Sequence, residues 1–191
     1  MLKWFKNFFI KHSLEQVSSP FFLGQKNILL YFDDCVCFKN SVRQTKYFKN
    51  IANFLVNKNL HSLLYQNRVK LFVRAPYIGS AWKGRFPVSN ISFVDDKFIK
   101  QSKEYMQMLI TDSSVLSLEF IASDRPIIFY NLCRKKNPKV PQLYNVSESI
   151  DKLLTLLSYY VENDFKLQKE YKEKNFLFLS SLQKENKKTI L

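Results

Sequence analysis

Short apolar runs alternate along the chain with longer segments whose apolar residues recur at helical spacing. The short runs are rich in Ile, Leu, Val, Phe and Tyr and end at turn-forming residues, as buried strands do. We predict strands over Asn27–Phe32, Val69–Val73, Ile91–Val94, Met108–Ile110 and Pro126–Tyr130. Each run is too short to be a typical helix, so its length favours a strand over a helix.

Apolar residues three or four positions apart predict helices between these runs. The predicted helices are Val42–Lys58, a second piece around Leu60–Leu64, Lys97–Gln107, Ser114–Ala122, a helix capped by Ser147 and carrying Ile150 to Leu157, and a charged helix over 163–187. Residues 77–90, which contain two of the three glycines, are predicted to be a loop. Strands that alternate with helices indicate an α/β fold with a Rossmann-like parallel sheet and helices on both faces.

This pattern divides the chain into three predicted parts. Residues 27–160 form the Rossmann-like domain, and residues 161–191 form a charged C-terminal helix and tail. Residues 1–26 are an N-terminal amphipathic and linker segment, in which Leu2, Phe5, Phe8 and Phe9 share one helical face among lysines. Lysines beside aromatic residues are typical of an interfacial helix on an anionic membrane, and packing of these aromatics on the domain is the alternative.

The net charge and the cysteines limit the classes of protein to which the chain can belong. The net charge of +14 favours polyanionic partners such as phosphate-rich substrates or anionic lipid, unless the lysines only solvate the surface. Cys35, Cys37 and Cys133 form no CxxC pair, which argues against a disulfide framework and a zinc site and favours a reducing cytoplasm. No apolar run approaches the roughly 20 residues of a membrane-spanning helix.

The strongest chemical signal lies over residues 108–130, which are predicted to form a strand, a polar turn, a helix and a second strand. The turn is Thr111, Asp112, Ser113 and Ser114. Hydroxyls and unpaired backbone N–H groups at such a junction bind anions, and ligands of open α/β sheets gather at the carboxyl ends of strands. The alternative is that one of these side chains only caps the helix.

This stretch resembles the C-terminal nucleotide-binding half of the CDP-glycerol glycerophosphotransferase family, the teichoic acid and capsule polymerases of GT-B type. Family members carry a run like L-I-T-D-Y-S-S-V-x-x-D-F followed by a Pro-Ile-Ile-Phe-Tyr strand, and this chain has LITDSSVLSLEF at 109–120 and DRPIIFY at 124–130. The resemblance implies a nucleotide-diphosphate donor such as CDP-glycerol as substrate, with no other cofactor. It also implies a transferase in cell-wall or capsule biosynthesis, here truncated or half of a split enzyme whose missing domain a second chain supplies.

The chain departs from the family pattern at two places. Ser113 falls at the family's Tyr and Val115 at its second Ser, so one hydroxyl is lost or shifted. The family's His-Pro is replaced here by Arg74-Ala75-Pro76. The planar fork of Arg74 suits phosphate oxygens, but an arginine stays protonated and cannot act as a general base. The catalytic residues are therefore unknown.

Each of the other candidate residues can be interpreted either as part of a binding site or as serving only the fold or the solvated surface. Glu119 is expected, from the resemblance, to bind ribose hydroxyls, or else it is solvated or ion-paired. Asp33-Asp34 would suit Mg²⁺ but more simply begin a turn, as do Asp95-Asp96. His12 and His61 lie in no metal or nucleophile pattern, so we expect no metal site. The basic cluster Arg134-Lys135-Lys136 attracts a diphosphate or anionic polymer, or is a solvated loop, and lies in no nucleic-acid motif.

Two hypotheses follow. The first is a CDP-glycerol or CDP-polyol glycerophosphotransferase-like domain that binds a nucleotide-activated polyol or sugar donor through Arg74, Thr111, Asp112, Ser113, Ser114 and Glu119. Its acceptor would be an anionic polymer, and its place would be the cytoplasm at the inner face of the cell membrane. The second is a catalytically inactive nucleotide-binding or membrane-peripheral α/β module.

Overall fold

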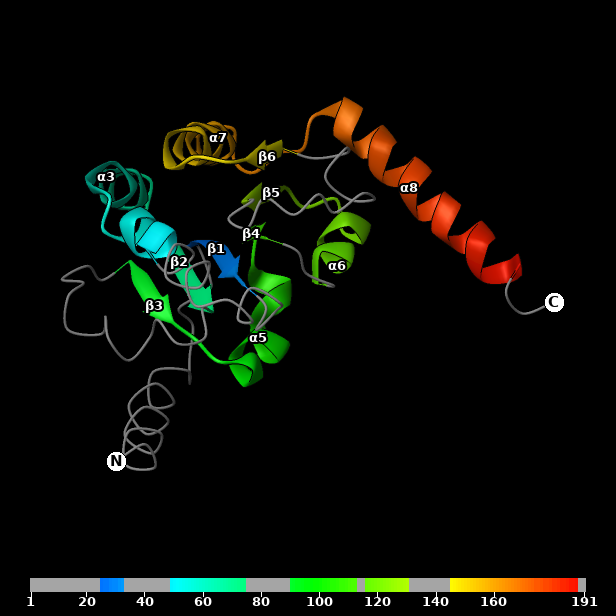
Figure 1. Cartoon of the computed structure of the whole chain (residues 1–191), viewed down its shortest axis with the longest axis horizontal. Helices are drawn as coiled ribbons and strands as arrows, with labels where there is room; N and C mark the ends of the chain where they lie inside the picture. The colour runs from blue at the N-terminus through cyan, green and yellow to red at the C-terminus, as the bar shows by residue number, and fades with distance from the viewer. Residues whose placement is uncertain (1–24, 33–48, 75–89, 113–115, 131–144, 189–191) are drawn as a thin grey trace.

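The structure is a computed structural model that describes residues 25–32, 49–74, 90–112, 116–130 and 145–188 of the 191-residue chain (Figure 1). Its centre is a six-stranded sheet in which every neighbouring pair of strands is parallel, in the order β3-β2-β1-β4-β5-β6. The strands are β1 (Lys26–Tyr31), β2 (Val69–Arg74), β3 (Ile91–Phe93), β4 (Met108–Thr111), β5 (Ile127–Tyr130) and β6 (Asn145–Ser147). All five predicted strands are present to within two residues.

The sixth strand, β6, was missed because it is only three residues long and has one apolar residue, Val146. Ser147, which we predicted as a helix cap, is the last residue of β6, and its hydroxyl donates to the Ser149 carbonyl at 2.7 Å. The cap of α7 (Ile150–Glu162) is Ser149 instead, because its hydroxyl accepts from the Lys152 amide. The prediction placed the cap two residues too early.

Helices cover both faces of the sheet, as the sequence predicted (Figure 1). On one face, a helix at 49–55, α3 (Lys58–Gln66) and α7 cover a core that includes Ile28, Leu30, Leu71 and Ile110. On the other face, α5 (Asp96–Ser102), α6 (Leu116–Ala122) and α8 (Lys169–Lys188) cover a core that includes Leu29, Leu109 and Ile127. Side chains alternate between the two faces along each strand, so both faces are apolar, as a central parallel sheet requires.

Three predicted helices differ from the structure in extent. The helix predicted over 42–58 ends at 55 in its described part, because Asn57 caps α3 by accepting from the Asn59 and Leu60 amides. The helix predicted over 97–107 is α5 followed by a 3₁₀ turn, η2 (Lys103–Tyr105). The charged C-terminal helix begins at Lys169 rather than at 163, after Asp164 and Phe165, both of which have a positive φ angle.

Candidate functional site

The order of the strands defines a switch point between β1 and β4. From β1 the chain proceeds to β2 and β3 on one side, and from β4 it proceeds to β5 and β6 on the other. In open parallel sheets, the helices leave in opposite directions at such a point, which opens a crevice outside the carboxyl ends of the two central strands. At these ends Tyr31 is the last residue of β1 and is followed by Phe32, and Thr111 is the last residue of β4 and is followed by Asp112.

The strand register places the predicted site residues in one row along the carboxyl edge. Arg74 lies opposite Tyr31, Tyr31 opposite Thr111, and Thr111 opposite Phe129. Neighbours in a parallel sheet point to the same face, and Tyr31 and Phe129 pack in the core under α5 and α6. Arg74 and Thr111 therefore belong to that face of the sheet, at the edge where the crevice opens.

Thr111 is the central residue of this row. It is fully buried, and its hydroxyl oxygen Oγ1 has no hydrogen-bond partner among the described residues. A buried hydroxyl without a partner costs about 1–3 kcal/mol. Four buried side-chain atoms in the described residues lack a partner, those of Asn27, His61, Thr111 and Arg125, and the Thr111 hydroxyl is the one that lies at the switch point. The hydroxyl at the switch point is thus suited to bind a polar ligand group.

The rest of the predicted turn is described only in part. Asp112 follows β4, is half-buried, and takes part in a polar or electrostatic interaction. Ser113 and Ser114 lie outside the described residues. The helix predicted at 114–122 is present as α6 from Leu116, so it begins within five residues of Thr111, as the motif requires.

Hydrogen bonds to two described residues, Asp96 and Phe32, help to hold Arg74 in place. Its Nε and Nη2 donate to the two carboxylate oxygens of Asp96 at 3.0 and 3.1 Å, and its Nη1 donates to the Phe32 carbonyl at 2.5 Å. The guanidinium also lies over the Tyr31 ring, at 5.0 Å from its centre. The Arg74 side chain is 12% exposed and that of Asp96 59%, so it is the forked geometry that makes this pair stronger than a single-contact surface ion pair. Arg74 ties the carboxyl ends of β1 and β2 to the start of α5.

Asp95 and Asp96, which the sequence analysis interpreted together, have separate roles at the start of α5. Asp95 caps the helix, since its carboxylate accepts from the Phe98 amide at 2.8 Å. Asp96 is the partner of Arg74. Asp95 therefore caps a helix rather than beginning a turn. The pairing of Asp96 with Arg74 was not predicted, because the two residues are 22 positions apart.

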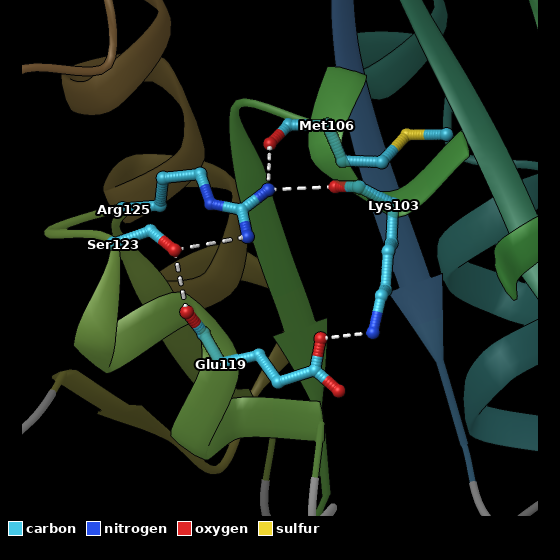
Figure 2. A network of polar contacts seen from close by, with 5 residues as sticks. All are labelled: Lys103, Met106, Glu119, Ser123 and Arg125. Atoms are coloured by element: carbon cyan, nitrogen blue, oxygen red, sulfur yellow. Dashed lines mark hydrogen bonds and ion pairs between the residues drawn. The ribbon is translucent and has the colours of Figure 1, made fainter. Parts of the chain in front are cut away.

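Glu119 lies on α6, and its carboxylate pairs with the Lys103 ammonium group of η2 (Figure 2). The Lys103 and Glu119 side chains are 37% and 48% exposed, so the pair is worth no more than about 1 kcal/mol. A ligand hydroxyl can therefore compete for this carboxylate at little cost. Lys103 is a charged group near the site that the sequence analysis did not single out.

Arg125 supports this pair from the amino edge of the sheet (Figure 2). Its Nη1 donates to the carbonyls of Lys103 and Met106 at 2.6 and 2.9 Å, and its Nη2 donates to the Ser123 hydroxyl at 3.4 Å. Ser123 in turn donates to the Glu119 carbonyl at 2.7 Å. Burial lowers the pKa of the Arg125 guanidinium, which the nearby Glu119 carboxylate partly offsets, and the group remains a cation at neutral pH. Arg125 thus fixes the backbone of both residues of the Lys103–Glu119 pair.

Several other predicted features lie outside the described residues: Asp33-Asp34, His12, the three cysteines, the basic cluster at 134–136 and the segment 1–24. His61 is a half-buried residue of α3. The described ranges contain no group of three His, Cys, Asp or Glu side chains arranged to hold a metal ion. Within the same ranges, no helix combines the length and apolar character needed to cross a bilayer.

An open, all-parallel sheet in this order, with helices on both faces and a switch point between β1 and β4, defines the class. It is the Rossmann-like half of a GT-B glycosyltransferase fold, as the sequence predicted. At the level of sequence, no family model and no curated protein matches the chain.

Solved structures match it at low identity. The S. aureus MnaA–UDP co-structure aligns with a TM-score of 0.52 at 13% identity, over 85% of this chain and 43% of that one. TarM aligns with a TM-score of 0.52 at 14% identity, over 88% and 36%. UDP-GlcNAc 2-epimerase from Neisseria meningitidis, bound to UDP-GlcNAc, aligns with a TM-score of 0.52 at 12% identity, over 96% and 51%. The likeness is one of fold, and the chain spans about half or less of the length of these structures.

Proposed function

We propose that this chain is the donor-binding half of a GT-B-type transferase and that it binds the diphosphate of a nucleotide-activated donor at the carboxyl edge of β1 and β4. The observation that carries the proposal is the Thr111 hydroxyl, which is fully buried at the switch point and has no partner in the described part of the chain. A phosphate oxygen that accepts from this hydroxyl would remove the cost of leaving it unsatisfied.

Two further features support a nucleotide rather than a simple anion. The Glu119 carboxylate is half-exposed in a weak ion pair, and a carboxylate can accept from both adjacent ribose hydroxyls. MnaA and the N. meningitidis epimerase, which share this fold, are described with UDP and with UDP-GlcNAc. Thr111 would then contact the diphosphate and Glu119 the ribose, with Asp112, Ser113 and Ser114 forming the turn between them.

The particular reaction we propose is transfer of glycerol phosphate, or a related polyol phosphate, from a CDP-linked donor to a surface polymer. The support is the run LITDSSVLSLEF followed by DRPIIFY, which resembles the CDP-glycerol glycerophosphotransferases and whose Thr111 ends β4 at the carboxyl edge. The acceptor would be an anionic polymer such as a teichoic acid or capsule chain. The reaction would take place in the cytoplasm at the membrane, with the second lobe supplied by another domain or chain.

A second candidate function is favoured by Arg74. The guanidinium predicted to bind phosphate is engaged by Asp96 and the Phe32 carbonyl, so this side chain serves the fold. A chain without a cationic side chain available at this position, and without the family's His, would bind a nucleotide without turning it over. In this alternative the chain binds a nucleotide at the same site but does not catalyse its transfer.

The test is a thermal-melting panel on the full chain with CDP, UDP, CDP-glycerol, UDP-GlcNAc and, as an unrelated anion, sulfate. We predict that a nucleotide diphosphate at 100 times its Kd stabilises the chain by about 2.7 kcal/mol and raises its melting temperature, whereas sulfate does not. A larger rise with CDP-glycerol than with UDP-GlcNAc would support the CDP-polyol donor.

Thr111→Val is the sharpest variant, because it removes the hydroxyl and keeps the shape. We predict that it leaves the unliganded melting temperature unchanged or higher, since a buried unsatisfied group is removed, and that it abolishes the rise with nucleotide. The matched control is Thr155→Val on α7, whose threonine is exposed on the opposite face of the sheet. A nucleotide response that survives in Thr111→Val, or that is absent from the unmodified chain, contradicts the proposal.

A further inference from the structure

The C-terminal helix α8 has two different faces. Its inner face is anchored to α6: the buried Asn175 amide donates to the Ile121 carbonyl at 3.4 Å and to the Asp124 carboxylate at 3.1 Å. Phe178 and Leu179 pack beside it in the core on that side of the sheet. Figure 1 shows α8 along the outside of the molecule, with the other elements on one side of it only.

The outer face of α8 carries an exposed apolar pair. Phe176 is 71% exposed and Leu177 is 67% exposed, which makes them two of the most exposed large apolar side chains in the described part of the chain. They line an open hollow of about 480 Å³ together with Lys169, Lys172 and Glu173. We call these five residues the α8 outer face. An exposed apolar pair among lysines is typical of a surface that contacts another protein or a membrane.

The charge of the helix indicates whether a second copy of the chain or a lipid bilayer would cover this face. The helix has six lysines and three glutamates, and the whole chain carries +14. A second copy of the chain would bring the same excess of positive charge against it, which opposes association. An anionic bilayer is complementary, because lysine ammonium groups gain about 1 kcal/mol each near its surface while apolar side chains enter the headgroup region.

The lysines of this face are available to such a surface. Lys169 pairs with Glu173 at 3.9 Å, but their side chains are 92% and 64% exposed, and an ion pair of this kind is worth little. Lys172 is also exposed and lines the same hollow. A phosphate headgroup can therefore replace Glu173 as the partner of Lys169 with no change in the fold.

From these observations we infer that the α8 outer face docks the chain on an anionic lipid bilayer, with the helix in the plane of the surface. Phe176 and Leu177 enter the headgroup region, and Lys169 and Lys172 lie at the level of the lipid phosphates. This inference does not depend on the proposed donor site, which lies at the carboxyl edge of the sheet.

The test is co-sedimentation of the full chain with vesicles of phosphatidylcholine alone and of phosphatidylcholine with phosphatidylglycerol. We expect binding to the anionic vesicles only, reduced in high salt because screening weakens contacts between exposed charges and lipid. The double variant Phe176→Ser, Leu177→Ser should bind at least about tenfold more weakly, since two apolar side chains no longer leave water. Tyr65→Ser on α3, where the ring is 75% exposed, is the matched control and should bind as the unmodified chain does.

Three results would overturn the inference. One is equal binding of the double variant and the unmodified chain to anionic vesicles, or no binding by either. Another is a loss of binding in Phe5→Ser, Phe8→Ser but not in the α8 variant, which would assign the contact to the predicted N-terminal helix. The third is light scattering that finds a dimer of the unmodified chain and a monomer of the α8 variant, which would assign the face to a second copy.

Discussion

At the scale of the residue, the site is organised by what each polar side chain already contacts. Arg74 has three strong acceptor contacts, Glu119 has one weak pair, and the Thr111 hydroxyl has no partner among the described residues. A ligand gains most from a group that is buried and unsatisfied, and least from a group whose partner it must first displace. Thr111 is therefore the residue on which donor binding should depend most, followed by Glu119.

The role of Arg74 can be tested through stability. Arg74→Lys keeps the charge but loses the fork that grips both Asp96 oxygens and the Phe32 carbonyl, so we predict a fall of about 1–2 kcal/mol in the free energy of unfolding. Arg68→Lys, at an exposed position, is the matched control and should change it by less than about 0.5 kcal/mol. Urea titration of both variants gives the comparison. Equal stability of the two would show that the Asp96 pair contributes nothing to the fold.

At the scale of the element, the helices differ in how they are attached. The helices α3 and α7 and the helix at 49–55 are fixed by apolar packing, with residues such as Leu60, Leu64 and Leu157 fully buried. In α8, the apolar packing of Phe178 and Leu179 is joined by a buried amide, because Asn175 bridges to the end of α6 and to Asp124, which adopts a φ of 52° just before β5. A positive φ is tolerated by Asp better than by most residues, so this turn suits its sequence.

The attachment of α8 gives a prediction at this scale. Asn175→Leu leaves the Ile121 carbonyl and the Asp124 carboxylate without their donor, so we expect a loss of about 1–3 kcal/mol that is local to this helix. Hydrogen exchange should show faster exchange of α8 amides, with α7 amides unchanged. Asn53→Leu, an exposed position on the helix at 49–55, is the control and should change neither helix. Uniformly faster exchange in Asn175→Leu would mean that α8 and the domain unfold together.

More of the fold than of the site could be predicted from the sequence. Runs such as Asn27–Phe32 and Val69–Val73 determine the strands because local apolar patterning is sufficient to identify them. The three-residue strand β6 has too little pattern, and the cap of α7 was misplaced because Ser147 and Ser149 are both plausible caps by residue type. The pairs Arg74–Asp96 and Lys103–Glu119 join distant positions, and only the packing of helices on the folded sheet brings them together.

At the scale of the whole molecule, the two edges of the sheet have different roles. The amino edge is tied by Arg125 and by Asn27, whose backbone amide donates to the Gln107 side chain and whose carbonyl accepts from the Gln107 amide. The carboxyl edge holds the row from Arg74 to Phe129, with the buried Thr111 hydroxyl at the switch point. Buried side-chain atoms without a described partner occur at both edges, because Asn27 Oδ1 and Arg125 Nε lie at the amino edge. The carboxyl edge is distinguished by the switch point between β1 and β4, where open parallel sheets bind their ligands.

The most direct measurement of this central claim is a nuclear magnetic resonance titration of the full chain with CDP, which maps the bound nucleotide onto the sheet. The account predicts that the amide shift changes concentrate at the carboxyl edge, at Tyr31, Thr111, Asp112 and Glu119, while Asn27 and Gln107 at the amino edge stay unchanged. Shift changes centred on the amino edge or on the α8 outer face, or none at saturating CDP, would contradict it.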